Sequence, residues 1–113
     1  MRVLLLNAAV MPREGRYDLK RLTAEEFGGL VEFWHGVGLL VPTIGYQATA
    51  DWIEELTALR FPVCRDSAQI VDGDTMLICR LKYRVNNPAA KGLVKPAAED
   101  WEYFECKFIA NAG

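Results

Sequence analysis

An apolar run near the amino terminus places the strongest constraint on the fold. Residues 3–6 read Val-Leu-Leu-Leu, and Asn7 ends the run. A strand without polar alternation lies inside a sheet and is covered on both faces. The run is far shorter than the roughly 20 residues of a membrane span, and Asn7 interrupts it too early for a secretory signal. We therefore predict a buried central strand within an α/β (α+β) fold.

The whole chain, residues 1–113, is predicted to form a single small domain. Its composition is 51% hydrophobic and 25% charged, which is the range of globular proteins. A domain of this size buries roughly 65% of its unfolded surface, so its core needs no metal or disulfide. A formal net charge of −2 argues against a surface for duplex nucleic acid. We expect a soluble, cytoplasmic protein with no cofactor and no membrane partner.

The cysteines and the single histidine exclude the familiar metal and disulfide frameworks. Cys64, Cys79 and Cys106 are widely spaced, odd in number and without a CxxC pair, so we predict buried, reduced thiols and no metal site. His35 is the only histidine, which leaves at most one imidazole for acid–base chemistry. It stands at the predicted end of a helix, where a capping or partly buried role is usual.

The spacing of apolar residues predicts two helices. Residues 23–26 read Thr-Ala-Glu-Glu, a capping box in which the threonine hydroxyl and the Glu26 carboxylate each accept a backbone N–H from the other residue. This helix is predicted to run to about His35. A turn-rich passage over residues 42–47 then leads to a second helix from about residue 48 to residue 59.

Five strands are predicted, and two of them form a hairpin. Residues 72–74 read Asp-Gly-Asp between two β-rich runs, and Asp-Gly in such a place is a strong hairpin signal. The predicted strands are residues 2–6, 16–22, 67–71, 75–85 and 101–109, and residues 86–100 are predicted to form a long loop.

A row of three cations lies on one face of the fourth predicted strand. Arg80, Lys82 and Arg84 alternate with apolar residues, so their side chains share one face. Adjacent like charges repel, and the row is therefore either a solvated strand face or the binding surface of a shared anion. The start of the second helix, residues 45–49, is another candidate anion-binding site, because the N–H groups of a helix's first turn have no partner within the helix.

The combination of these motifs resembles a known family. It consists of Asn7 after the first strand, residues 43–50 opening a helix, Arg65, and residues 80–84 ending a strand. The chain resembles the small anti-CRISPR ring nucleases of archaeal viruses and phages, which remove cyclic tetra-adenylate, the second messenger of type III CRISPR immunity. The resemblance runs from the first strand to about Val85.

The resemblance implies both an architecture and a site. The architecture is a homodimer around a mixed sheet of about five strands flanked by two or more helices, with the cyclic nucleotide in a two-fold pocket between subunits. Arg84 corresponds to the family's pocket arginine, and Asn7 to the asparagine after its first strand. The residues expected to contact the ligand are Asn7, Gly45, Tyr46, Gln47, Thr49, Arg80, Lys82, Arg84 and Asn87.

The chain departs from the family pattern at the position implied to be catalytic. Where the family has Ile-Gly-His, this chain has Ile44-Gly45-Tyr46, so the histidine thought to protonate the leaving oxygen is replaced by Tyr46. A tyrosine hydroxyl is a poor proton shuttle at neutral pH, and losing a general acid typically costs about 10² to 10⁴ in rate. Arg80 stands where the family tends to have glutamine, and Asn87 lies near a family acidic residue. Both changes make the implied pocket more positive.

Three functions remain open on these grounds. The first is a dimeric sponge that sequesters a cyclic oligoadenylate in the host cytoplasm as an anti-defence protein. The second is a metal-independent ring nuclease that uses Tyr46, or His35 if the fold brings it into the pocket. The third is a protein interaction module whose basic strand faces an acidic partner. We favour the sponge because added cations favour phosphate binding and the missing histidine disfavours turnover.

Overall fold

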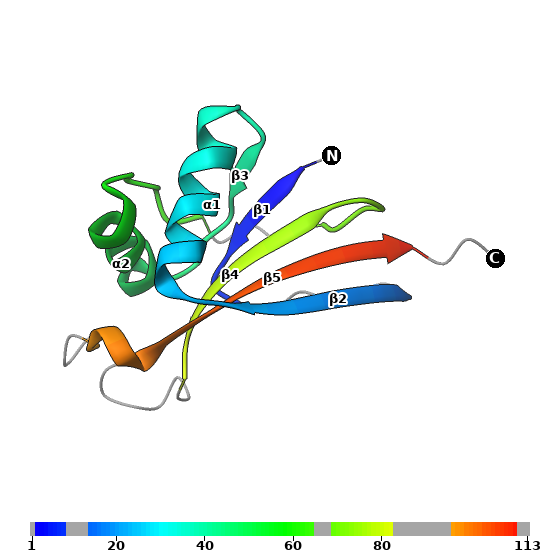
Figure 1. The fold of residues 1–113 in the computed structure, drawn as a ribbon. Helices are drawn as coiled ribbons and strands as arrows, with labels where there is room; N and C mark the ends of the chain where they lie inside the picture. The colour runs from blue at the N-terminus through cyan, green and yellow to red at the C-terminus, as the bar shows by residue number, and fades with distance from the viewer. Residues whose placement is uncertain (1, 9–13, 65–68, 83–95, 111–113) are drawn as a thin grey trace.

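A five-stranded mixed sheet forms the centre of the protein, and two helices pack on one of its faces (Figure 1). The computed structural model describes residues 2–8, 14–64, 69–82 and 96–110. The strand order is β2-β5-β4-β1-β3, which confirms the predicted α+β class. The elements are β1 (Val3–Leu6), β2 (Gly15–Leu22), α1 (Ala24–Gly36), β3 (Leu40–Pro42), α2 (Gln47–Thr57), β4 (Thr75–Leu81), a 3₁₀ turn (Ala98–Asp100) and β5 (Trp101–Ala110).

Strand β1 occupies the predicted interior position. It pairs in parallel with β3 on one side and with β4 on the other, and all four of its residues are buried. Strand β5 continues the sheet by pairing antiparallel with β4 and with β2. The carboxyl ends of three parallel strands, β3, β1 and β4, therefore meet along one edge of the sheet.

Both helices form where the sequence predicts them. Helix α1 begins at the Thr23 capping box, in which the Glu26 N–H donates to the threonine hydroxyl at 3.1 Å and the Thr23 N–H donates to the Glu26 carboxylate at 3.0 Å. Helix α2 ends two residues earlier than predicted because Ala58 takes a left-handed conformation, with φ of 62°.

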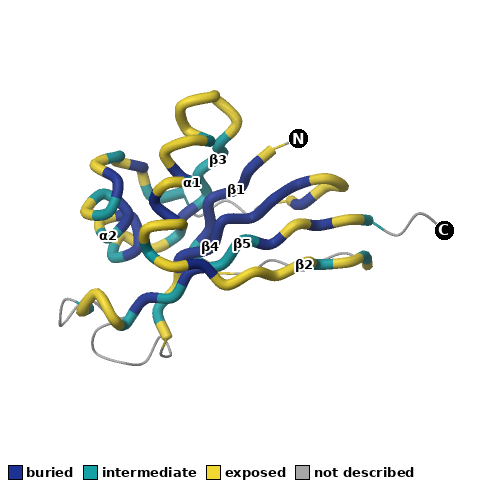
Figure 2. Tube along the Cα trace, in the orientation of Figure 1, coloured by how far each residue is buried: buried dark blue, intermediate teal, exposed yellow. Residues whose placement is uncertain are grey.

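Two apolar clusters hold the sheet, one on each face. Figure 2 shows that β1 and β4 are mostly buried, whereas β2 at the edge of the sheet is mostly exposed. The larger cluster joins α1 and α2 to the sheet and includes Phe27, Val31 and Ile53. The smaller cluster lies on the opposite face and includes Ile70 and Phe108. No helix in the part of the chain that the structure describes is long and apolar enough to cross a membrane.

The predicted hairpin at residues 72–74 is wrong. A turn is present there, but residues 69–71 form no strand, and β4 pairs with β1 and β5 instead. The buried Asp74 carboxylate closes the turn by accepting the Val71 N–H at 2.9 Å. Asp72 meanwhile accepts the Ala110 N–H at 2.9 Å, which ties the turn to the end of β5.

Two other boundaries differ from the predictions. Strand β3 was not among the predicted strands, because its three residues continue directly into the turn-rich segment before α2. Of the predicted loop over residues 86–100, the described part contains the 3₁₀ turn at Ala98–Asp100. Residues 83–95 lie outside the described residues, so the end of the predicted fourth strand and most of this loop are untested.

Candidate functional site

The side chain of Asn7 links the ends of two parallel strands. It follows β1, and its Oδ1 accepts the backbone N–H of Gly45 at 2.8 Å in the segment that leaves β3. Two residues before Gly45, the N–H and the hydroxyl of Thr43 both donate to the Leu5 carbonyl, at 2.9 and 3.2 Å. These bonds fix the path of the chain from β3 into α2, beside the carboxyl end of β1. We call the surface formed by Asn7 and residues 45–47 the carboxyl-edge site.

Gly45 lies within ordinary contact distance of two other parts of the site, so the structure would accommodate a Cβ atom there. A Cβ atom on Gly45 would lie 3.6 Å from Asn7 Oδ1 and 4.0 Å from the Cys64 carbonyl oxygen. The carbonyl of the buried Ile44 accepts the Cys64 N–H at 2.8 Å, which holds the turn from its other side. The turn is therefore anchored by backbone and side-chain bonds before α2 begins.

The first turn of α2 opens toward this site. Tyr46 is the N-cap residue and makes no capping hydrogen bond with its side chain, which is 48% exposed. The Ala50 N–H donates to the Tyr46 carbonyl at 3.2 Å, so the preceding N–H groups have no partner within the helix. These N–H groups and the positive end of the helix dipole form a seat for an anion.

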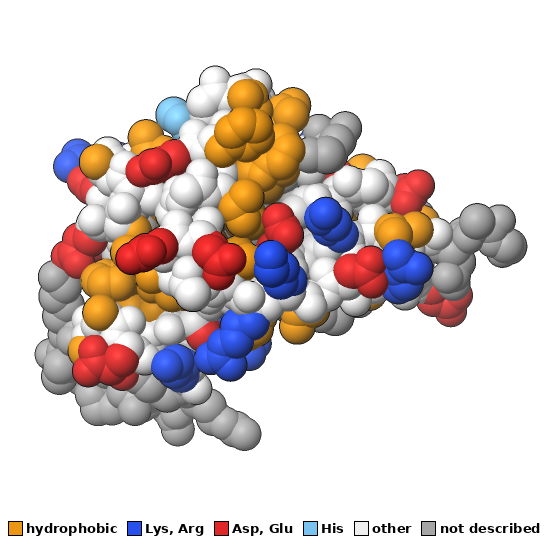
Figure 3. Space-filling view, viewed as in Figure 1, with side chains coloured by type: hydrophobic (Ala, Val, Ile, Leu, Met, Phe, Trp, Pro, Cys, Tyr) orange, Lys and Arg blue, Asp and Glu red, His pale blue; other side chains and the backbone are white. Residues whose placement is uncertain are grey.

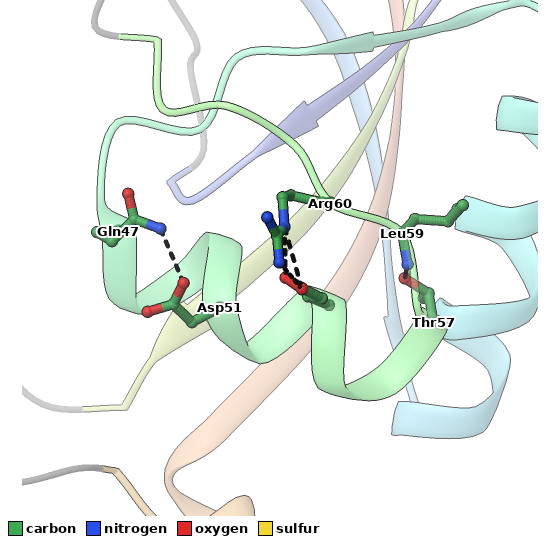
Figure 4. A network of polar contacts seen from close by, with 6 residues as sticks. Gln47, Asp51, Thr57, Leu59 and Arg60 are labelled. Atoms are coloured by element: carbon green, nitrogen blue, oxygen red, sulfur yellow. Dashed lines mark hydrogen bonds and ion pairs between the residues drawn. The ribbon is translucent and has the colours of Figure 1, made fainter.

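Two predicted ligand contacts on α2 have other roles in the fold. The Gln47 side-chain amide donates to Asp51 at 2.8 Å along the helix surface, as Figure 4 shows. Thr49 is buried, with 3% exposure, and packs into the core. The Thr49 hydroxyl is therefore not exposed to a ligand in this structure.

The predicted cation row is engaged by neighbouring groups. Arg80 forms an ion pair with Glu102 of β5 at 2.6 Å, and these two residues lie directly opposite each other across the strands. Its guanidinium also lies 5.0 Å from the centre of the Phe104 ring. Lys82 Nζ donates to the Glu99 carbonyl at 2.6 Å. The Arg80 side chain is still 48% exposed, so both interpretations of the row, a solvated face and a surface for a shared anion, stay predictions.

Sequence reasoning missed Glu102 and its second partner. Arg21 of β2 reaches the same carboxylate at 3.5 Å, and its guanidinium lies 5.9 Å from the centre of the Phe104 ring. Three strands thus contribute to one network of two cations, one carboxylate and one ring. Alternation along residues 101–109 could have placed Glu102 and Phe104 on one face, but only the β4–β5 register brings Arg80 to them.

The sheet separates the cation row from the carboxyl-edge site. Leu5 pairs with Leu77, and both lie in the cluster beneath the helices, so alternation assigns Asn7 to that face. Arg80 alternates with Cys79 in β4 and therefore lies on the other face, while Lys82 follows the end of the strand. The described residues of the two groups do not contact each other. Arg65, Arg84 and Asn87 lie outside the described residues, and their predicted roles are untested.

The histidine lies away from the carboxyl-edge site. His35 is exposed in the last turn of α1, and its ring packs edge-on against Phe61 at 5.9 Å. The chain after α1 enters the amino end of β3, where the Leu39 carbonyl accepts the Val3 N–H at 3.1 Å. Asn7 and Gly45 mark the opposite ends of the same two strands, so the fold does not bring His35 to the implied catalytic position.

The prediction of buried thiols is confirmed for two of the three cysteines and is wrong for Cys64. All three are free thiols, and Cys79 and Cys106 are buried while Cys64 is partly exposed. Within residues 2–8, 14–64, 69–82 and 96–110, no group of three His, Cys, Asp or Glu side chains is arranged to hold a metal ion.

The fold and site define a class: a small α+β protein with a polar site at the carboxyl ends of parallel strands. A family model described as STIV B116-like matches residues 3–103, and the chain belongs to this family. Among solved structures, the chain is similar to B116 of Sulfolobus turreted icosahedral virus (STIV), with a TM-score of 0.77 and 20% identity over 94% of this chain and 98% of that one. A comparison with curated proteins found no match.

These comparisons support the fold and the viral family that the sequence resemblance implied. The family and the fold are those of a viral protein, B116. At 20% identity the likeness to B116 demonstrates a shared fold. The anti-CRISPR activity, the cyclic nucleotide and the dimer stay predictions.

Proposed function

We propose that two copies of this chain enclose a cyclic oligonucleotide, in the first instance a cyclic oligoadenylate, and sequester it without efficient cleavage. In this proposal the protein is a virus-encoded sponge that removes an immune second messenger in the cytoplasm of the host cell. Each protomer contributes its carboxyl-edge site, so a two-fold ligand meets every group twice.

The single observation that carries the proposal is the orientation of Asn7. Its Oδ1 already accepts the Gly45 N–H, and therefore its Nδ2 group remains as a hydrogen-bond donor. The first-turn N–H groups of α2 add further donors beside it. Such donors suit the phosphate and ribose oxygens of a nucleotide, and the neighbouring Asp51 carboxylate is engaged by the Gln47 amide.

Binding is favoured over cleavage by what the site contains. In-line attack on a phosphodiester needs a group that gives a proton to the leaving oxygen. The only histidine of the chain lies at the other end of β3, and the exposed Tyr46 occupies the position that a family histidine would hold. Membership of the STIV B116-like family supports the viral part of the proposal, because the solved relative is a viral protein.

The test of binding is a substitution that keeps the Asn7–Gly45 bond but removes the donor. Asn7→Asp retains an acceptor for the Gly45 N–H and adds a negative charge beside the phosphate. We expect it to weaken the affinity for cyclic tetra-adenylate at least tenfold, measured by calorimetry. The matched control is Gln69→Glu, which adds the same charge near the amino end of β1, where the Gln69 carbonyl accepts Arg2. It should bind within twofold of the parent, and equal effects of the two substitutions would contradict the site.

The test of sequestration is the fate of the ligand. The protein is incubated with cyclic tetra-adenylate, denatured by heat, and the nucleotide is separated by chromatography. Recovery of the intact ring is expected. Recovery of linear products at many turnovers per dimer would instead establish the ring nuclease, and loss of that turnover in Tyr46→Phe would assign it to the tyrosine. Absence of binding to any cyclic nucleotide would favour the protein interaction module.

A further inference from the structure

A groove lies between α1 and the strands β2 and β5, apart from the carboxyl-edge site. Its volume is about 360 Å³, and Leu22 and Leu30 give it an apolar part. Gly29 leaves it open, since a Cβ atom at that position would meet nothing within 4 Å. The remaining lining residues are Lys20, Glu25, Glu26 and Glu105.

The groove continues into an exposed apolar stripe on α1. Leu30, Phe33 and Val37 follow one another at spacings of three and four residues, so they share one side of the helix. Phe33 is 57% exposed and Val37 is 51% exposed. Figure 3 shows hydrophobic side chains gathered over the upper part of α1. The outer side of a surface helix is normally polar, and therefore this stripe is a candidate interface.

The groove is acidic. Three carboxylates and one ammonium line it, which gives a net charge of −2. Backbone and side-chain hydrogen bonds with Thr23 lower the pKa of Glu26, so that carboxylate stays ionised at neutral pH. A nucleic acid or an anionic membrane would be repelled by this surface, whereas lysine and arginine side chains would be attracted.

We propose that this face docks a partner protein through an amphipathic segment that carries apolar anchors flanked by lysine or arginine. The stripe and groove extend along residues 25–37, about 20 Å of helix. Such a length accommodates a partner helix of about three turns lying in the groove. The proposal is independent of nucleotide binding, because none of its residues belongs to the carboxyl-edge site.

The probes are two synthetic helical peptides that share the same spacing of leucines. One peptide is rich in lysine, and the other is rich in glutamate. Nuclear magnetic resonance titration of the labelled protein is expected to shift the amides of residues 25–37 with the lysine peptide. Its affinity should fall as salt rises, and the glutamate peptide should bind at least tenfold more weakly. The proposal would be overturned if the two peptides bound with equal affinity or if the lysine peptide shifted no amides. It would also be overturned if the protein bound anionic lipid vesicles in preference to the lysine peptide.

Two variants on α1 separate docking in the groove from attraction by overall charge. At Gly29 the Cβ atom of a new side chain would meet nothing within 4 Å. Gly29→Lys therefore places a cation in the groove and should weaken binding of the lysine peptide at least tenfold. The matched control is Glu32→Lys, which changes the net charge by two units rather than one. Glu32 is exposed and lies about 160° around the helix from Leu30, so its substitution should change the affinity less than twofold. A larger effect of Glu32→Lys would contradict the groove.

Discussion

Asp74 is the charged residue that the fold buries most deeply within the described part of the chain, with 1% side-chain exposure. Its carboxylate accepts the Arg2 guanidinium at 2.8 Å and the Val71 N–H at 2.9 Å. Burial raises the pKa of Asp74, but the hydrogen bonds from Arg2 and Val71 outweigh it and hold the pKa below its usual value. This one side chain ties the strand start at β1 to the turn before β4.

The lowered pKa of Asp74 predicts how stability changes in acid. A depressed folded-state pKa means that the stabilisation is complete above the unfolded-state value, about 3.9, and is lost as pH falls through the folded-state value. We expect Asp74→Asn to cost about 1–3 kcal/mol in the free energy of unfolding near pH 7. In urea titrations this difference should shrink below about pH 4. The exposed Asp18→Asn serves as control and should cost less than about 0.5 kcal/mol, and a pH-independent Asp74 effect would contradict the assignment.

The three thiols should differ in reactivity. Burial raises the pKa of the Cys79 thiol well above its usual value, and it also raises the pKa of Cys106. Because the thiolate is the reactive form, only the partly exposed Cys64 should react quickly with Ellman's reagent in the native protein. All three thiols should react after denaturation in urea. Equal rates for the three thiols in the native state would show that the β4–β5 core is not closed as described.

At the scale of elements, α2 ends at an alanine that has an unfavourable backbone conformation. Ala58 has a φ of 62° and closes the helix by donating its N–H to the Glu54 carbonyl at 2.8 Å. A left-handed conformation costs an alanine about 1–2 kcal/mol, and glycine adopts it freely. After the greater entropy of an unfolded glycine is subtracted, Ala58→Gly should stabilise the protein by about 0.5–1 kcal/mol in thermal or urea unfolding.

A second alanine of the same helix provides the control for this substitution. Ala48 lies in the first turn of α2, where glycine is unfavourable. Ala48→Gly should therefore destabilise the protein by a similar or larger amount. If both substitutions destabilised it, Ala58 would not have the conformation described here.

Elements with strong local signals could be predicted from the sequence, and elements set by distant pairing could not. The apolar β1 and the Thr23 capping box are local patterns, and both are confirmed. The Asp-Gly dipeptide at residues 72–73 predicts a hairpin from local sequence alone, whereas the partners of β4 are strands distant in sequence. β1 and β5 take both edges of β4, which leaves none for residues 69–71.

The same distinction applies to the candidate site. The family resemblance predicts Asn7 and Gly45 as ligand contacts, but their hydrogen bond to each other depends on the pairing of β1 with β3, which the sequence does not predict. Alternation along β4 places Arg80 on the face opposite Cys79, and Lys82 lies just beyond the end of the strand. Alternation could not show that Glu102 lies opposite Arg80, because that pairing depends on the β4–β5 register. The burial of Thr49 likewise depends on how α2 packs against the sheet.

At the scale of the whole molecule, one protomer offers only half of the proposed pocket. The carboxyl-edge site lies at the surface, and its Tyr46 side chain is 48% exposed. Arg80, the cation that the structure describes in β4, lies on the other face of the sheet and is paired with Glu102. A ring-shaped nucleotide would therefore need a second copy of the site to cover it, with the two-fold symmetry that a homodimer supplies.

The stoichiometry of binding tests this account most directly. Calorimetric titration with cyclic tetra-adenylate gives the number of ligand molecules bound per protein chain. Light scattering gives the mass of the complex and therefore the number of chains in it. The account predicts saturation at one ring per two chains, in a complex with the mass of a dimer. Saturation at one ring per chain, or a complex with the mass of a single protomer, would contradict it.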